Sequence, residues 1–176
     1  MNQARIVVLG SLNMDMVLRV PHFPVAGETL LGHDLRHVPG GKGGNQAVSC
    51  ARQGAAVRLL SCVGEDAYGA QLLTALRSDG IDVSHVQQVR DASTGVAVIS
   101  VDDAGQNQIV VMAGANQQLR VPEAQLKSLL GDADFVVLQF ETPLSEVNQA
   151  LQVARQAGCK VALNPSPFHA LEESWW

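Results

Sequence analysis

The sequence is poor in aromatic and charged residues, and both shortages restrict the kind of protein it can be. Aromatic residues make up 4% and charged residues 16% of the chain, whereas 47% of its residues are hydrophobic. A chain with this balance is globular rather than disordered. Because aromatic side chains are scarce, the core must consist mainly of Val, Leu, Ala and Ile, as is common in parallel-sheet proteins.

The chain also lacks a basic excess, a long apolar run and paired cysteines. The net charge is −5, whereas broad nucleic-acid binding needs a basic surface. No run of 18 apolar residues predicts a membrane span, and the N-terminal residues do not have the layout of a signal peptide. The three cysteines are far apart without a CxxC pair, which disfavours a disulfide framework and a zinc site. We therefore expect a cytoplasmic protein that binds neither nucleic acid nor membrane.

Apolar runs of strand length alternate with helical patterns along most of the chain. The runs are continuous rather than alternating, which is typical of strands buried on both faces. Several helical patterns end at a glycine, a common helix stop. This order predicts an α/β fold, with helices on both faces of a parallel sheet. The expected strands are 6–9, 57–63, 135–138 and 161–163, and the expected helices are 45–53, 67–78, 122–130 and 144–157.

Two segments interrupt this alternation. Residues 16–38 contain two strand-like stretches, 16–20 and 29–38, around a loop with Pro and Gly. Residues 95–101 and 108–112 alternate more clearly and are joined by a hairpin-like polar turn. We predict that these four strands form one small accessory sheet beside the main one.

Polar residues follow three of the predicted parallel strands. Asn13 and Asp15 come after the first strand, Glu141 after the run 135–140, and Asn164 after 161–163. In open α/β sheets, ligands bind beyond the carboxyl ends of the strands. Carboxylates accept hydrogen bonds from hydroxyls, and amides both donate and accept, so these residues suit a polyhydroxyl ligand. The alternative is that Asn13 and Asp15 only cap a turn.

A glycine-rich block, residues 40–44, surrounds Lys42 and leads into a predicted helix. Glycines let the backbone approach a ligand closely, and the N–H groups at a helix start can hold an anion or a sugar oxygen. The spacing matches neither the P-loop nor the GxGxxG pattern. The alternative is a plain glycine-rich turn.

The remaining polar segments predict structure rather than chemistry. Residues 63–69 could line the site, but we favour Asp66 as a helix cap. His33 and His37 lie on a strand-like segment, where a spacing of four does not converge on a metal. Cys50 and Cys62 fall on apolar faces, so cysteine catalysis is not expected.

Taken together, these segments resemble the ribokinase, or PfkB, family of carbohydrate kinases, over about residues 5–167. The glycine–lysine block 40–47 is the most specific of the matching motifs. The resemblance implies that residues 1–167 form the N-terminal part of a Rossmann-like αβα sandwich, with lid strands at about 16–38 and 95–112. The other matching segments are 10–15, 24–29, 63–66, 93–97, 114–116, 139–141 and 164–167.

The resemblance also implies an activity, the ATP-dependent conversion of D-ribose to D-ribose 5-phosphate. It implies ATP, Mg²⁺ and a monovalent cation such as K⁺ as cofactors, and a homodimer formed through the lid. Residues 96–98 would cover the sugar ring. Other sugars or nucleosides (deoxyribose, fructose) remain alternative substrates, and a non-catalytic sugar-binding or dimerisation fragment remains an alternative role. The implied sugar-binding residues are Asn13, Met14, Asp15, Gly41, Lys42, Gly43, Gly44, Asn45, Val96 and Glu141.

One feature of the family has no counterpart in the sequence. The family's Gly-Ala-Gly-Asp motif supplies a catalytic Asp and an anion hole, and the resemblance places the nucleotide and cation sites in the same later half. We therefore assign no catalytic residue, and we expect a truncated chain with little or no kinase activity of its own. Residues 168–176 are expected to be a divergent tail. Truncation also predicts exposed apolar surface at sheet edges and faces.

Overall fold

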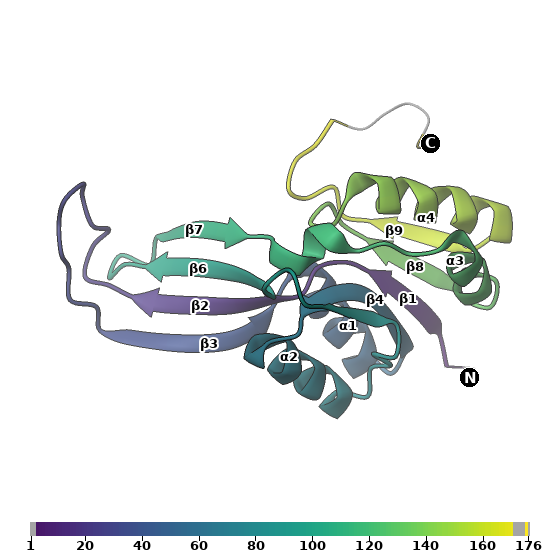
Figure 1. Ribbon diagram of the computed structural model, residues 1–176, viewed down its shortest axis with the longest axis horizontal. Helices are drawn as coiled ribbons and strands as arrows, with labels where there is room; N and C mark the ends of the chain where they lie inside the picture. Colours follow the sequence, from purple (N-terminus) through teal and green to yellow (C-terminus); the bar gives the residue numbers. More distant parts are fainter. Residues whose placement is uncertain (1–2, 171–174, 176) are drawn as a thin grey trace.

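The computed structural model describes residues 3–170 and 175, and its main layer is a five-stranded parallel sheet (Figure 1). The strand order is β5-β4-β1-β8-β9, with every neighbouring pair parallel. This confirms the predicted α/β class. The strands are β1 (Arg5–Leu9), β4 (Ala56–Gly64), β5 (Val86–Val89), β8 (Phe135–Leu138) and β9 (Lys160–Leu163).

Helices cover both faces of this sheet, as predicted (Figure 1). Because successive side chains of a strand point to opposite faces, neighbouring residues of β1 enter different cores. Val7 packs in the core beneath α3 and α4, and Val8 packs in the core beneath α1 and α2; both are fully buried. The helices are α1 (Lys42–Arg52), α2 (Ala67–Ser78), α3 (Glu123–Leu130) and α4 (Leu144–Ala157).

The accessory sheet has four strands in the order β3-β2-β6-β7 and extends away from the main sheet (Figure 1). Strands β2 and β6 are parallel, and the two outer pairs are antiparallel. The prediction of one small sheet built from the two interrupting segments is confirmed. Its strands are β2 (Asn13–Arg19), β3 (Asp34–Gly40), β6 (Gly95–Val101) and β7 (Asn107–Met112).

Helix α2 shows how local sequence signals fix an element. It spans the predicted residues, and Asp66 caps it by accepting a hydrogen bond from the Gly69 N–H at 2.8 Å. Asp66 also accepts from the backbone N–H of Thr94, at 2.7 Å, just before β6. Burial acts to raise the pKa of Asp66, but these hydrogen bonds outweigh it and hold that pKa below its ordinary value. The predicted capping role is confirmed, and the same carboxylate anchors the accessory sheet.

Three predicted boundaries are wrong by three residues or more. Strand β2 begins at Asn13 rather than at residue 16, so Asn13 and Asp15 lie within the strand. Strand β3 begins at Asp34 rather than at residue 29, because the preceding residues form a loop with a turn at Gly27, whose φ is +84°. Helix α1 begins at Lys42 rather than at residue 45. Strand β5 and the 3₁₀ helix η1 (Gly114–Gln118) were not predicted.

Exposed apolar side chains concentrate on the accessory sheet and at one edge of the main sheet. Residues 109–112 of β7 are each at least 46% exposed. Phe135 of β8 and Val161 of β9 are 37% and 41% exposed, in line with the exposed apolar surface that the sequence predicts. Within the described residues, no helix has the length and apolar character needed to cross a membrane.

Candidate functional site

The two sheets are joined by four chain crossings, and the candidate site lies where these crossings meet. Residues 10–12 carry the chain from β1 into β2, and Gly41 carries it from β3 into α1. Residues 92–94 lead into β6, and Ala113 leads out of β7 towards η1. This places the site beyond the carboxyl end of β1, as the sequence predicts.

Glu141 is the centre of the polar contacts. Its Oε2 accepts hydrogen bonds from Ser11 Oγ at 2.5 Å and from the Lys42 N–H at 3.1 Å. Its Oε1 lies 3.5 Å from Lys42 Nζ. One carboxylate therefore connects the end of β1, the start of α1 and the end of β8.

The first turn of α1 uses its own N–H groups internally. The Lys42 N–H donates to Glu141, the Gly44 N–H donates to the Ser11 carbonyl at 3.0 Å, and the Gly43 N–H points at Ser11 Oγ, 3.5 Å away. In this structure the anionic group at the helix start is the protein's own Glu141 carboxylate, and binding of an external anion or a sugar oxygen there stays a prediction.

Asp15 and Asn13 lie two residues apart on β2, so their side chains point to the same face of the accessory sheet. Burial raises the pKa of Asp15, and the nearby negative charge of Glu141 raises it further. The Asp15 carboxylate lies against the backbone of Gly40, where any Cβ would overlap it. Gly40 thus makes room for the carboxylate at the site.

Asn13 is held by Asn116, a residue of η1 to which the sequence analysis gave no role. Asn116 Nδ2 donates to Asn13 Oδ1 at 2.9 Å, and both side chains are buried. Asn116 belongs to the motif 114–116, but its partner lies 103 residues earlier in the chain. Only the folded structure shows the contact.

Two predicted site residues face away from the others. Met14 is 1% exposed and packs in the core beneath α1 and α2. Val96 pairs with Met14 in the β2–β6 register, so it shares that face rather than the face of Asp15. The same register places Ala97 beside Asp15, and Ile99 two residues further along the same face. The apolar residues on the site face are therefore Ala97 and Ile99.

The glycines of the predicted block let the backbone pack closely at the start of α1. Gly41 has a φ of +87° and lies against the backbone of residues 11–13. Gly43 and Gly44 are buried, and a Cβ on Gly43 would lie 2.5 Å from the Gly10 carbonyl carbon. They let α1 approach the β1–β2 crossing closely. Asn45 is exposed on the first turn of α1.

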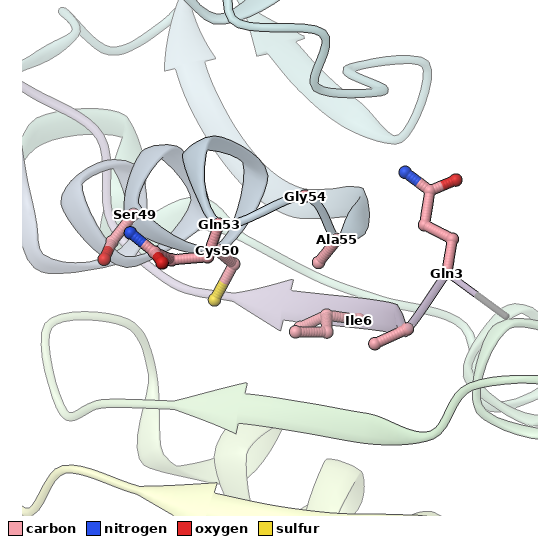
Figure 2. Close-up of a pocket in the computed structure, with 8 residues that line it drawn as sticks. Gln3, Ile6, Ser49, Cys50, Gln53, Gly54 and Ala55 are labelled. Atoms are coloured by element: carbon pink, nitrogen blue, oxygen red, sulfur yellow. The ribbon is translucent and has the colours of Figure 1, made fainter. Parts of the chain in front are cut away.

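A separate cavity of about 660 Å³ lies at the opposite end of β1 and does not coincide with the predicted site (Figure 2). Its lining includes Ile6 of β1 and Ser49, Cys50 and Gln53 of α1. Burial raises the pKa of the Cys50 thiol, so the lining carries no reactive thiolate. Among residues 3–170 and 175, no group of three or more His, Cys, Asp or Glu side chains could hold a metal ion.

Comparison with known proteins identifies the family of the chain. The family of pfkB carbohydrate kinases matches residues 3–174. Ribokinase of Haemophilus influenzae is 42% identical over 169 residues, and deoxyribokinase of Salmonella typhi is 34% identical over 163 residues. The alignments cover 96% and 92% of this chain.

A solved structure agrees with this result. The structure of Arabidopsis thaliana ribokinase complexed with ribose and ATP is 31% identical and superimposes with a TM-score of 0.83 over 92% of this chain. The chain spans about half the length of these relatives: 55% of the Haemophilus protein and 53% of both the Salmonella protein and the Arabidopsis chain. From the match over nearly its whole length, the chain belongs to the pfkB family of carbohydrate kinases.

Proposed function

We propose that the chain forms the sugar-binding part of an ATP-dependent kinase that converts D-ribose to D-ribose 5-phosphate. The observation that carries this proposal is the meeting of Asp15 and Glu141 with Lys42 at the junction of the two sheets. Carboxylates accept hydrogen bonds from sugar hydroxyls, and an ammonium group donates hydrogen bonds to the hydroxyl oxygens of a sugar. The relatives named ribokinase support ribose as the sugar.

The accessory sheet would contribute both a polar and an apolar contact to the sugar. Asn13 and Asp15 would bind hydroxyls, while Ala97 and Ile99, on the same face, would cover the C–H surface of the ring. A binding site with a few placed polar groups and an apolar wall is typical of small-molecule sites.

We assign the phosphoryl-transfer residues to the part of the relatives that lies outside the match. These relatives are nearly twice as long as the chain, and the Lys42 N–H at the start of α1 is already bonded to the Glu141 carboxylate. ATP, with Mg²⁺ and a monovalent cation such as K⁺, would bind mainly in that other part. We expect the purified chain to show no ATP-dependent ribose phosphorylation, and a turnover of about 1 s⁻¹, the low end for kinases, would contradict this.

Ribose binding to the chain, measured by calorimetry, tests the proposed function. We expect Asp15→Asn to weaken ribose binding by about tenfold or more, because the amide cannot replace both acceptor oxygens of the carboxylate. The matched control is Asp103→Asn, at an exposed position of the β6–β7 turn. Equal ribose affinity of the wild type and the Asp15→Asn variant would rule out the assigned site.

Deoxyribose is the second candidate substrate, and the similarity to a deoxyribokinase favours it. The two sugars differ by one hydroxyl, and a site built to hydrogen-bond that hydroxyl rejects the sugar that lacks it. Calorimetry with ribose and 2-deoxyribose in parallel separates the two. A preference for 2-deoxyribose would replace ribose as the substrate.

We also propose that the accessory sheet pairs with a second copy of the chain in the cytoplasm. The exposed apolar residues 109–112 of β7 support pairing, and the three free cysteine thiols suit a reducing compartment. Sedimentation tests the pairing, with Val110→Asp expected to shift a dimer to monomer. A dimer that forms while ribose does not bind would favour a non-catalytic pairing role.

A further inference from the structure

Asn116 connects the chain crossing that leads into β2 with the crossing that leads out of β7. Its Oδ1 accepts from the Leu12 N–H at 2.9 Å, and its Nδ2 donates to the Leu12 carbonyl at 3.0 Å. Nδ2 also donates to the Ala113 carbonyl at 3.0 Å, on the way from β7 into η1. The side chain is 1% exposed, so water does not compete for these contacts.

The backbone partners fix the orientation of the Asn116 amide. An N–H group can only donate and a carbonyl can only accept, so Oδ1 must face the Leu12 N–H and Nδ2 must face the carbonyls of Leu12 and Ala113. The atom that Asn116 presents to Asn13 is therefore Nδ2, a donor. The two hydrogens of Nδ2 are shared among three acceptors, the carbonyls of Leu12 and Ala113 and Asn13 Oδ1. A flipped amide would lose its hydrogen bonds to the Leu12 N–H and to both backbone carbonyls.

The orientation of Asn13 follows from that of Asn116. Its Oδ1 accepts from Asn116 Nδ2 at 2.9 Å and lies against Gly95, where any Cβ would overlap it. Within the described residues, Asn13 Nδ2 has no hydrogen-bond acceptor, and it is not among the fully enclosed polar atoms. The free end of the Asn13 amide is thus a donor.

We infer that Asn116 is a positioning residue, which turns Asn13 so that a donor faces the sugar beside the acceptor Asp15. The part of this inference that concerns the sugar rests on the proposed function. Asn13 Nδ2 and the Asp15 carboxylate, side by side on β2, form a donor–acceptor pair. Such a pair matches hydroxyl groups, which accept through oxygen and donate through hydrogen.

A double-mutant cycle on ribose affinity tests the coupling. We expect Asn116→Ala to weaken ribose binding about tenfold in the wild type and to have no further effect once Asn13→Ala is present. Equal losses in both backgrounds would show that Asn116 acts only through stability and would overturn the inference.

The variant Asn13→Asp keeps an acceptor for Asn116 but removes the donor, so it should also lose about tenfold in affinity for ribose. Wild-type affinity of Asn13→Asp would overturn the inference too.

A measurement without ligand separates this inference from the proposed function. By NMR hydrogen exchange, the side-chain NH₂ of Asn116 should be protected and that of Asn13 should exchange fast. Asn13→Ala should accelerate exchange at Asn116, whereas Asn107→Ala, at an exposed position of β7, should not. Absence of ribose binding would contradict only the proposed function. An Asn116 NH₂ that exchanges as fast as that of Asn107, or that does not respond to Asn13→Ala, would contradict the inference.

Discussion

The main sheet and the accessory sheet are built from similar apolar residues but are covered differently. In the main sheet, helices enclose both faces, and Val7 and Val8 of β1 are fully buried. In the accessory sheet, every residue of β7 is exposed, including Val110 at 63%. The main sheet therefore supplies most of the hydrophobic free energy of folding, because that energy scales with the apolar area removed from water.

This difference assigns distinct roles to the two sheets at the site. Ser11 and Glu141 follow β1 and β8 of the main sheet, and Ser11 is fully buried. Strand β2 carries Asn13 and Asp15, and it belongs to a sheet whose β7 leaves apolar side chains exposed. A large exposed apolar surface is typical of a ligand or partner surface.

The largest expected effect comes from truncating one apolar side chain in each sheet. Leu59 of β4 is fully buried, so Leu59→Ala should lower the free energy of unfolding by about 2–5 kcal/mol. Ile109 of β7 is 53% exposed, so Ile109→Ala should change the free energy of unfolding by only about 0.5 kcal/mol. Denaturant melts of both variants measure the contrast. Similar losses would mean that both sheets are covered to the same extent in solution.

An intermediate effect is expected at the junction between the sheets. A Cβ at Gly43 would lie 2.5 Å from the Gly10 carbonyl carbon, whereas the nearest atom to a Cβ at Gly44 would be the Leu12 Cδ2 methyl at 2.9 Å. We expect Gly43→Ala to destabilise the protein by about 1–3 kcal/mol, because backbone cannot move aside easily. Gly44→Ala should stay within about 1 kcal/mol, since the gain in helix propensity offsets a small side-chain shift. Thermal melts that rank Gly44→Ala as the worse variant would contradict the close packing of α1 on the β1–β2 crossing.

The smallest expected effect is a stabilisation, and it depends on pH. Asp15 has a pKa raised in the folded state by burial and by Glu141, so its ionisation costs folding free energy. The penalty is absent below the ordinary carboxyl pKa of 3.8 and develops as pH rises through the higher folded-state pKa. Asp15→Asn should therefore be more stable than the wild type near neutral pH, by less than about 1 kcal/mol because water screens a half-buried group.

Denaturant melts at neutral pH and below pH 3.8 measure this difference, which should disappear at the lower pH. The isosteric amide keeps the shape of the side chain, so packing is an internal control. A variant that is less stable than the wild type at neutral pH would show that Asp15 gains more from its partners than it loses by burial.

Much of the fold was predictable because strong local signals mark its elements. Helix α2 was predicted with its observed bounds, since Asp66 caps its start and Gly80 follows its end. Strand β8 was predicted equally well because its apolar run is continuous and short. The start of α1 was missed, since Gly43 and Gly44 have low helix propensity and become helical only through packing on residues 10–12.

The site was predictable in part. The sequence placed Asn13, Asp15 and Glu141 at strand ends, and the structure brings Asp15 and Glu141 close enough for their charges to interact. The sequence could not show to which face of the accessory sheet Val96 points, because strand register depends on a partner about 80 residues away in the chain. Nor could it reveal Ser11 and Asn116, whose hydrogen bonds join distant segments.

The long separations within the site have a consequence for folding kinetics. The contact between Ser11 and Glu141 joins residues 130 apart, and the contact between Asn13 and Asn116 joins residues 103 apart. Contacts across such loops cost closure entropy and form only when the intervening chain is already compact. The site should therefore assemble late in refolding and open only with global unfolding. In a hydrogen-exchange experiment, the backbone amides around Ser11 should be among the slowest to exchange in the protein.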